Sequence, residues 1–305
     1  MSSTMIRSAE TGLDARGRHP SLAERVRSSG RAFRRSDLLL RIAVVILLAL
    51  LFTALVAAVT GIAGSTSDTV GQRLQPPSAA FPLGTDNLGR SVLPRLLEGI
   101  GTTLLLSTIA VALSATISTV LGLVAGYVGG AVSESVLRVV DVIYAFPALI
   151  LAILVSAVVG PGREAALVSI VLITIPLMTR MVRISARQTV GRDFVVAARI
   201  SGVGAARILL THLLPNAAGT IAVQASYALS VAILVEGGLS FLGYGVQVPG
   251  ASLGLLIQDG MLYMSTAPWL LLAPGVVLVL AILCVNLIGD GLRDQFEPRE
   301  TRSLS

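Results

Sequence analysis

Lysine is absent from this 305-residue chain, and all 23 basic residues are arginine. A nucleotide-binding loop of the G-x-x-x-x-G-K-[ST] type needs its lysine against the phosphates, so the chain cannot hydrolyse ATP with that machinery. One cysteine and two histidines exclude a disulfide framework and make a Cys- or His-rich metal site untenable. The sequence also lacks a Ser-His-Asp arrangement, HExxH and CxxC. We therefore expect no catalytic residues, no metal site and no cofactor.

Charged residues are scarce as well. They make up 13% of the chain, against about a quarter in soluble domains. Hydrophobic residues reach 54% and the mean hydropathy is +0.83. Six apolar runs are long enough, or nearly so, to cross about 30 Å of hydrocarbon as helices, and none alternates like a barrel strand. The sequence predicts an all-α polytopic membrane protein with six transmembrane helices at 42–63, 104–128, 142–159, 165–181, 220–242 and 269–288.

The arginines are unevenly distributed between the two sides of such a bundle. Six crossings place the tail 1–41, the central loop 182–219 and the tail 291–305 together, and all but four arginines fall on that side. The exceptions are Arg73, Arg90, Arg95 and Arg163. The positive-inside rule then predicts that both termini and the central loop are cytoplasmic, with 64–103 outside. This bias accounts for the net charge of +6, so no nucleic-acid partner is expected.

The first 41 residues are rich in serine, arginine and glycine, which predicts a flexible tail. Its arginines would lie near anionic membrane lipid. We favour a role in fixing the topology over a specific lipid-binding or regulatory site.

The most informative stretch is Asp193–Asn216, DFVVAARISGVGAARILLTHLLPN. Two alanines, a glycine four residues later and a distant Leu-Pro pair resemble the cytoplasmic EAA loop of bacterial ABC-importer permeases. The pattern AAR-x-x-G…RI…H-x-LPN is similar to the motif of the peptide and nickel branch, although Val196 and His212 replace the usual glutamate and isoleucine. The resemblance implies that this loop docks a separate ATPase through Ala197, Ala198, Arg199, Gly202, Arg207, Ile208, His212, Leu214 and Pro215.

The loop also has a physical interpretation. Asp193–Ser201 is expected to be helical, with the aspartate at the positive end of the dipole. Gly202 allows a sharp turn, and 205–213 forms a second helix that presents Ile208, Leu209 and Leu213 on one face. Pro215 then ends that helix. A helix lying on the membrane surface is the alternative.

Two outer segments carry further resemblances to this branch. The string GTDNLGR contributes Gly84, Thr85, Asp86, Gly89 and Arg90, followed by a short interfacial helix from Ser91. We favour a structural turn here over contact with a substrate-delivery protein. The second segment, EGGLSFLGYGVQVPGASLG, covers 236–254 and departs from the branch at Val248 and Leu253.

Together these motifs identify the chain as resembling the dipeptide, oligopeptide and nickel permease family. The resemblance implies the type I ABC importer permease fold, with a core at 104–290 and an extra first helix. It also implies a second permease subunit in a heterodimer, two ABC ATPase subunits and an extracytoplasmic substrate-binding protein in the bacterial cytoplasmic membrane. Short peptides are the favoured substrate, with nickel chelates, glutathione or haem as alternatives.

Glu236 is the acidic residue placed deepest in an apolar run. An ionised acid inside a membrane should face protein or a water-filled path. It could line the translocation cavity or form hydrogen bonds in the packed interior, and we favour the second. A self-sufficient secondary transporter is the rival class, but Glu236 alone is a thin basis for an ion relay and no inverted repeat is visible. A membrane-embedded enzyme would need a paired nucleophile and base, and the sequence offers none.

Overall fold

The computed structural model describes residues 38–60 and 69–296. Within them the chain is helical apart from turns and one isolated bridge between Thr85 and Ser91. Five helices are long and apolar enough to span a membrane, and the bent pair α4 and α5 adds a sixth when it is taken as one broken span. The expected all-α membrane bundle is therefore confirmed, with five to six candidate spans. The helices are α2 Leu38–Val59, α3 Val92–Val128, α4 Gly130–Tyr144, α5 Ala148–Val159, α6 Arg163–Val190, α7 Asp193–Ile200, α8 Ala205–Ile208, the π-helical turn η2 Leu209–Leu213, α9 Leu214–Phe241, α10 Leu253–Met261 and α11 Trp269–Phe296.

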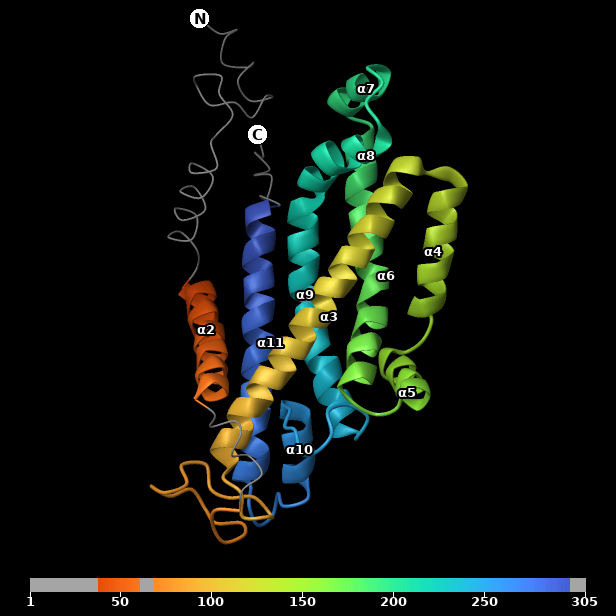
Figure 1. Cartoon of the computed structure of the whole chain (residues 1–305). Helices are drawn as coiled ribbons and strands as arrows, with labels where there is room; N and C mark the ends of the chain where they lie inside the picture. Colours follow the sequence, from red (N-terminus) through yellow and green to blue (C-terminus); the bar gives the residue numbers. More distant parts are fainter. Residues whose placement is uncertain (1–37, 61–68, 297–305) are drawn as a thin grey trace, which may run out of the picture.

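Helix α3 crosses the bundle obliquely and packs most extensively on α6 (Figure 1). Small residues allow this close crossing. A Cβ added at Gly122 would lie 2.7 Å from the Val182 Cβ, and one at Gly126 would lie 2.6 Å from the Ala186 Cβ. Membrane helices associate through such small-residue contacts because lipid tails are as apolar as leucine. The α3–α6 pair is thus the most extensive helix–helix contact in the bundle.

Two hydrophobic clusters join the other helices to this pair. One joins α3, α5, α6 and α9 and is rich in fully buried alanines such as Ala110, Ala166 and Ala232. The other joins α2, α3, α9, α10 and α11. Helix α2 sits at the edge of the bundle against α11, where a Cβ on Gly291 would lie 2.7 Å from Leu40. Most of the remaining surface of α2 is exposed and apolar, as expected for a lipid-facing helix.

The structure corrects several expected bounds. The interfacial helix expected after Ser91 is instead the first part of the 37-residue α3. The third crossing is not a straight helix over 142–159, because α4 and α5 meet at 89°. Pro147 explains the break, since it lacks an N–H and disfavours helical geometry at Phe146. Helices α6 and α11 extend beyond the expected bounds and pass through Pro176 and Pro274. In membrane helices neighbouring helices can satisfy the freed backbone groups.

The bundle has two different ends (Figure 1). One end carries α7 and α8, and the last turn of α11 lies towards it. The other end carries the segment 69–91 and α10, a buried helix that sequence patterning did not predict. Ser252 caps α10 by accepting a hydrogen bond from the Leu255 N–H.

Candidate functional site

The expected central motif forms a compact hairpin of α7 and α8. Gly202 joins them with φ +78°, in the left-handed region that glycine adopts without strain. The Gly202 N–H donates to the Arg199 carbonyl, and the Val203 N–H donates to the Ala198 carbonyl. This pair of bonds is a Schellman motif, which satisfies the last carbonyls of α7. The predicted turn at Gly202 is therefore present.

The second part of the motif differs from the prediction. Pro215 does not end a short helix but lies in the first turn of α9. Helix α8 passes into the π-helical turn η2 and then directly into α9. Because the chain is already helical before Pro215, the missing proline N–H falls next to the π-helical turn η2, where the regular hydrogen-bond ladder is interrupted. Leu214 and Pro215 therefore connect the hairpin rigidly to a transmembrane helix.

The predicted apolar face of this segment also needs correction. Ile208 and Leu213 are fully buried in a cluster with Leu123 of α3 and Val182 of α6. Because the chain itself covers these side chains, they anchor the hairpin and do not present a surface. The outward surface of the hairpin is instead formed by Phe194, Val196, Ala197, Ile200, Ala205, Ala206 and Leu210.

The polar members of the motif lie around this surface. The guanidinium of Arg199 lies over the ring of Tyr127 of α3, 5.1 Å from its centroid. Arg207 is exposed. His212 packs against Phe194 with ring centroids 5.9 Å apart. No group of histidine, cysteine, aspartate and glutamate within 38–60 and 69–296 could hold a metal ion.

At the other end, the outer motif folds into a turn held by Asp86. The carboxylate accepts hydrogen bonds from the main-chain N–H groups of Leu88 and Arg90 and from the Arg90 guanidinium at 2.7 Å. Gly84 and Gly89 have φ values of +73° and +77°, which suit glycine. Thr85 is fully buried and its hydroxyl donates to the Gln72 carbonyl at 2.6 Å. These contacts are internal to the chain, as the structural-turn interpretation expects.

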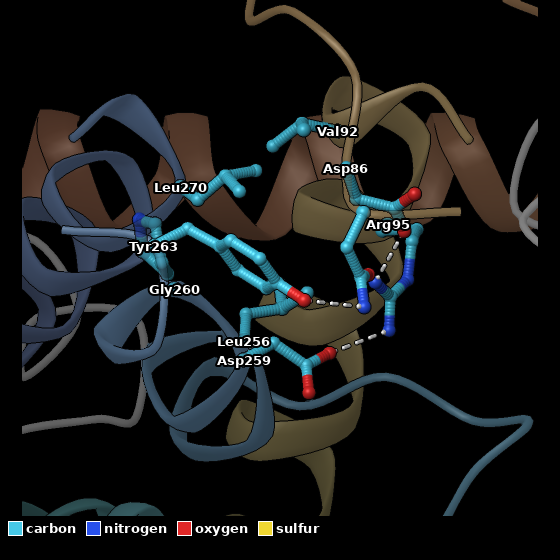
Figure 2. Close-up of a pocket in the computed structure, with 10 residues that line it drawn as sticks. Asp86, Val92, Arg95, Leu256, Asp259, Gly260, Tyr263 and Leu270 are labelled. Carbon is cyan, nitrogen blue, oxygen red and sulfur yellow. Dashed lines mark hydrogen bonds and ion pairs between the residues drawn. The ribbon is translucent and has the colours of Figure 1, made fainter. Parts of the chain in front are cut away.

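Arg95 ties this turn to the rest of the outer end (Figure 2). The side chain is 1% exposed and lies between Asp86, at 2.9 Å, and Asp259 of α10, at 3.3 Å. Asn87 adds a hydrogen bond to the Tyr263 hydroxyl. The space left between these groups is only about 10 Å³, room for one water at most. Sequence reasoning counted Arg95 as an outer arginine but missed its buried role.

Glu236 belongs to a second buried network at the same end. It is fully buried, and its two oxygens accept 2.7 Å hydrogen bonds from the hydroxyls of Thr103 and Ser240. Those hydroxyls accept in turn from the N–H groups of Leu253 and Val246. The network therefore fastens the outer segment and α10 to α3 and α9. Glu236 is therefore enclosed by packed side chains of this chain.

Comparison with known proteins decides the family. Residues 118–302 match the model for the binding-protein-dependent transport system inner membrane component. The chain belongs to this family. It is a multi-pass protein of the bacterial inner membrane.

The relatives within the family are similar over most of their length. The chain is 34% identical to the di/tripeptide transport system permease protein DppC of Pseudomonas aeruginosa, over 74% of this chain and 77% of that one. It is 36% identical to a putative peptide transport system permease protein of Brucella suis, over 90% and 92%. Escherichia coli DppC is 38% identical over 73% and 74%.

A solved structure supports the fold. A chain of the MetNI methionine ABC transporter in an inward-facing conformation superposes with a TM-score of 0.55 at 21% identity. The match covers 67% of this chain and 97% of that one. The helices thus adopt the type I ABC importer permease fold, as the sequence motifs implied.

Proposed function

We propose that the chain is one of two permease subunits of an ATP-driven importer for short peptides. A second permease would complete the translocation path, two ABC ATPase subunits would bind on the cytoplasmic side, and a substrate-binding protein would deliver peptide outside. Both termini and the α7–α8 hairpin would be cytoplasmic. ATP hydrolysis would belong to the ATPase subunits.

The observation that carries this proposal is the likeness to peptide permeases along about three quarters or more of the chain. Relatives named for dipeptide, tripeptide or peptide transport are 34–38% identical over about three quarters or more of both chains. Such breadth covers the spanning helices as well as the coupling motif, so it favours a common kind of cargo over a shared docking motif alone.

The hairpin geometry supports the expected ATPase contact. Its outward surface has small alanines, among them Ala197, Ala205 and Ala206, which let a partner approach the backbone closely. Exposed Phe194 and Ile200 offer apolar anchors, and Arg207 is exposed on the same hairpin. A short helix with apolar and small residues suits insertion into a groove of another protein. Ile208 and Leu213 would transmit a push on the hairpin to α3 and α6, because they are buried between those helices.

The proposal implies alternating access. Closure of the ATPase pair would move the hairpin, and the continuous path from α8 through η2 into α9 would carry that motion into the membrane. Peptide released by the binding protein would then cross between the two permeases. The chain supplies no covalent chemistry in this cycle; it positions helices and forms one wall of the path.

The experiment is reconstitution of the chain with candidate partners: a second permease, two ABC ATPase subunits and a peptide-binding protein. We expect uptake of labelled alanyl-alanine and ATPase activity stimulated by the loaded binding protein. Arg207→Glu should reduce both by about tenfold or more, the scale expected when an interface hot spot is lost. Arg138→Glu is the matched control, because Arg138 is an exposed arginine on α4, away from the hairpin. Absence of peptide uptake by the unaltered complex would refute the substrate assignment.

A further inference from the structure

The break between α4 and α5 leaves main-chain polar groups outside both helices. The last bonds of α4 run from the Ala145 N–H to the Asp141 carbonyl and from the Phe146 N–H to the Ile143 carbonyl. The first bond of α5 runs from the Leu151 N–H to the Pro147 carbonyl. The carbonyls of residues 144–146 therefore lie outside both hydrogen-bond ladders.

This break lies level with the middle of α6, far from either end of the bundle. An open cavity of about 430 Å³ beside it is lined by Ile143–Ala148, Leu151 and, from α6, Ile173 and Pro176. Pro176 is near the middle of the 28-residue α6, so it lies about 20 Å from either end at 1.5 Å per residue. Irregular backbone at such depth is tolerated only where it is buried in protein or lines a water-filled cavity. We therefore do not expect this face to contact lipid.

The side chains around the cavity lead to the same conclusion. Tyr144 and Phe146 are 57% and 47% exposed, in a chain whose aromatic content is only 4%. Arg180 of α6 lies 2.5 Å from Asp141 and stacks on the Tyr144 ring at 4.7 Å. This ion pair remains accessible, with side-chain exposures of 34% and 56%. Charged groups within membrane spans face the bundle interior or a water-filled cavity.

We propose that this cavity lines the translocation path and contacts the peptide as it crosses. An apolar side chain of the peptide would pack against Tyr144 and Phe146. The charged amino and carboxyl groups of the peptide would pass beside Asp141 and Arg180, an ion pair of both signs that stands next to Tyr144 of the cavity wall. The volume lies in the range of small-molecule pockets, about 300–1,000 Å³, so one or two residues would fit. The nature of the ligand rests on the proposed function, whereas the water-facing character of the cavity does not.

Thiol accessibility tests whether the cavity faces water. Cys284 is the single cysteine and is buried, so Cys284→Ala gives a cysteine-free background. Phe146→Cys is compared with Phe52→Cys on α2, which replaces a phenylalanine that is 66% exposed at the bundle edge. In the reconstituted complex, a small cationic methanethiosulfonate should react with residue 146 far faster than with residue 52. Equal rates would overturn the proposal, because they would place residue 146 against lipid or in a dry contact with the second permease.

Substrate preference tests the peptide contact. Uptake of alanyl-phenylalanine relative to alanyl-alanine should fall about 2- to 10-fold in Phe146→Ala, the scale of one lost aromatic contact. Phe146→Leu, which fills more of the space, should fall less, and Phe52→Ala should leave the ratio unchanged. An unchanged ratio in both Phe146 variants would overturn the peptide contact. If the unaltered complex imports neither peptide while residue 146 still reacts rapidly, the water-facing path stands and the peptide assignment fails.

Discussion

At one end of the bundle Arg95 is 1% exposed and lies between two carboxylates, whereas at the other end Arg207 is exposed on a short helix. Both arginines belong to, or directly follow, motifs that resemble the same permease family. The outer motif uses its polar groups to bind other parts of the chain. The hairpin motif leaves small, apolar and charged groups on the surface.

The difference follows from how each segment satisfies the hydrogen bonds of its main chain. The segment 69–91 is mostly irregular, so its main-chain groups need partners, and Asp86, Thr85 and the glycine turns provide them. The hairpin satisfies its own main chain through α7, α8 and the Schellman motif, so its exposed side chains are not needed for that purpose and can contact another protein. Motif resemblance alone does not distinguish an internal scaffold from a docking surface; burial does.

The largest expected effect is at Arg95. Arg95→Met removes the cation shared by Asp86 and Asp259 and leaves Asp86, 3% exposed, with one arginine partner. Breaking a buried ion pair on one side costs about 3–5 kcal/mol. We expect a marked fall in the melting temperature of the purified complex. Arg138→Met is the control, since the exposed Arg138–Glu134 pair should contribute about 1 kcal/mol or less. Equal melting temperatures for the two variants would contradict a scaffold role for the outer motif.

A middle-sized effect is expected in the Glu236 network. Thr103→Val removes one donor to the buried carboxylate and one acceptor for the Leu253 N–H. Leaving buried polar groups unsatisfied costs about 1–3 kcal/mol each. Stability should fall while uptake per folded complex is retained. Thr108→Val on the same helix is the matched control, because its exposed hydroxyl bonds only to the Leu104 carbonyl. A loss of uptake without a loss of stability would return Glu236 to the translocation path.

The sequence patterns that depend on neighbouring residues predicted the structure well. Apolar runs located the five long spanning helices and the second half of the bent pair, and the glycine at position 202 marked a turn that the structure forms at φ +78°. The patterns did not predict features that depend on residues distant in the sequence. The burial of Arg95 depends on Asp259, which is 164 positions away. The polar contacts of Glu236 likewise depend on Thr103.

The prolines show the same limit within single helices. Pro147 lies at the break between α4 and α5. Pro176 and Pro274 lie inside uninterrupted helices, and Pro215 lies in the first turn of α9. The residue itself removes the same donor each time. Pro176 is buried against neighbouring elements, whereas the region of Pro147 is exposed. Tertiary surroundings therefore decide between a break and a continuous helix, and they are not encoded in the local spacing.

The smallest expected effect on stability is at Gly202, where the hairpin turns. A Cβ at this position meets nothing within 4 Å, so a substitution acts only through the left-handed backbone conformation. That conformation costs most L-residues about 1–2 kcal/mol, and less for asparagine. Gly202→Val should therefore shift the turn and reduce peptide-stimulated ATPase activity, with Gly202→Asn intermediate and little change in melting temperature. Gly204→Val is the matched control, since Gly204 is equally open but has φ −62°. If valine at 202 and at 204 gave the same ATPase coupling, the geometry of the hairpin turn would not be what a partner reads, and the contrast between the two ends would rest on side-chain exposure alone.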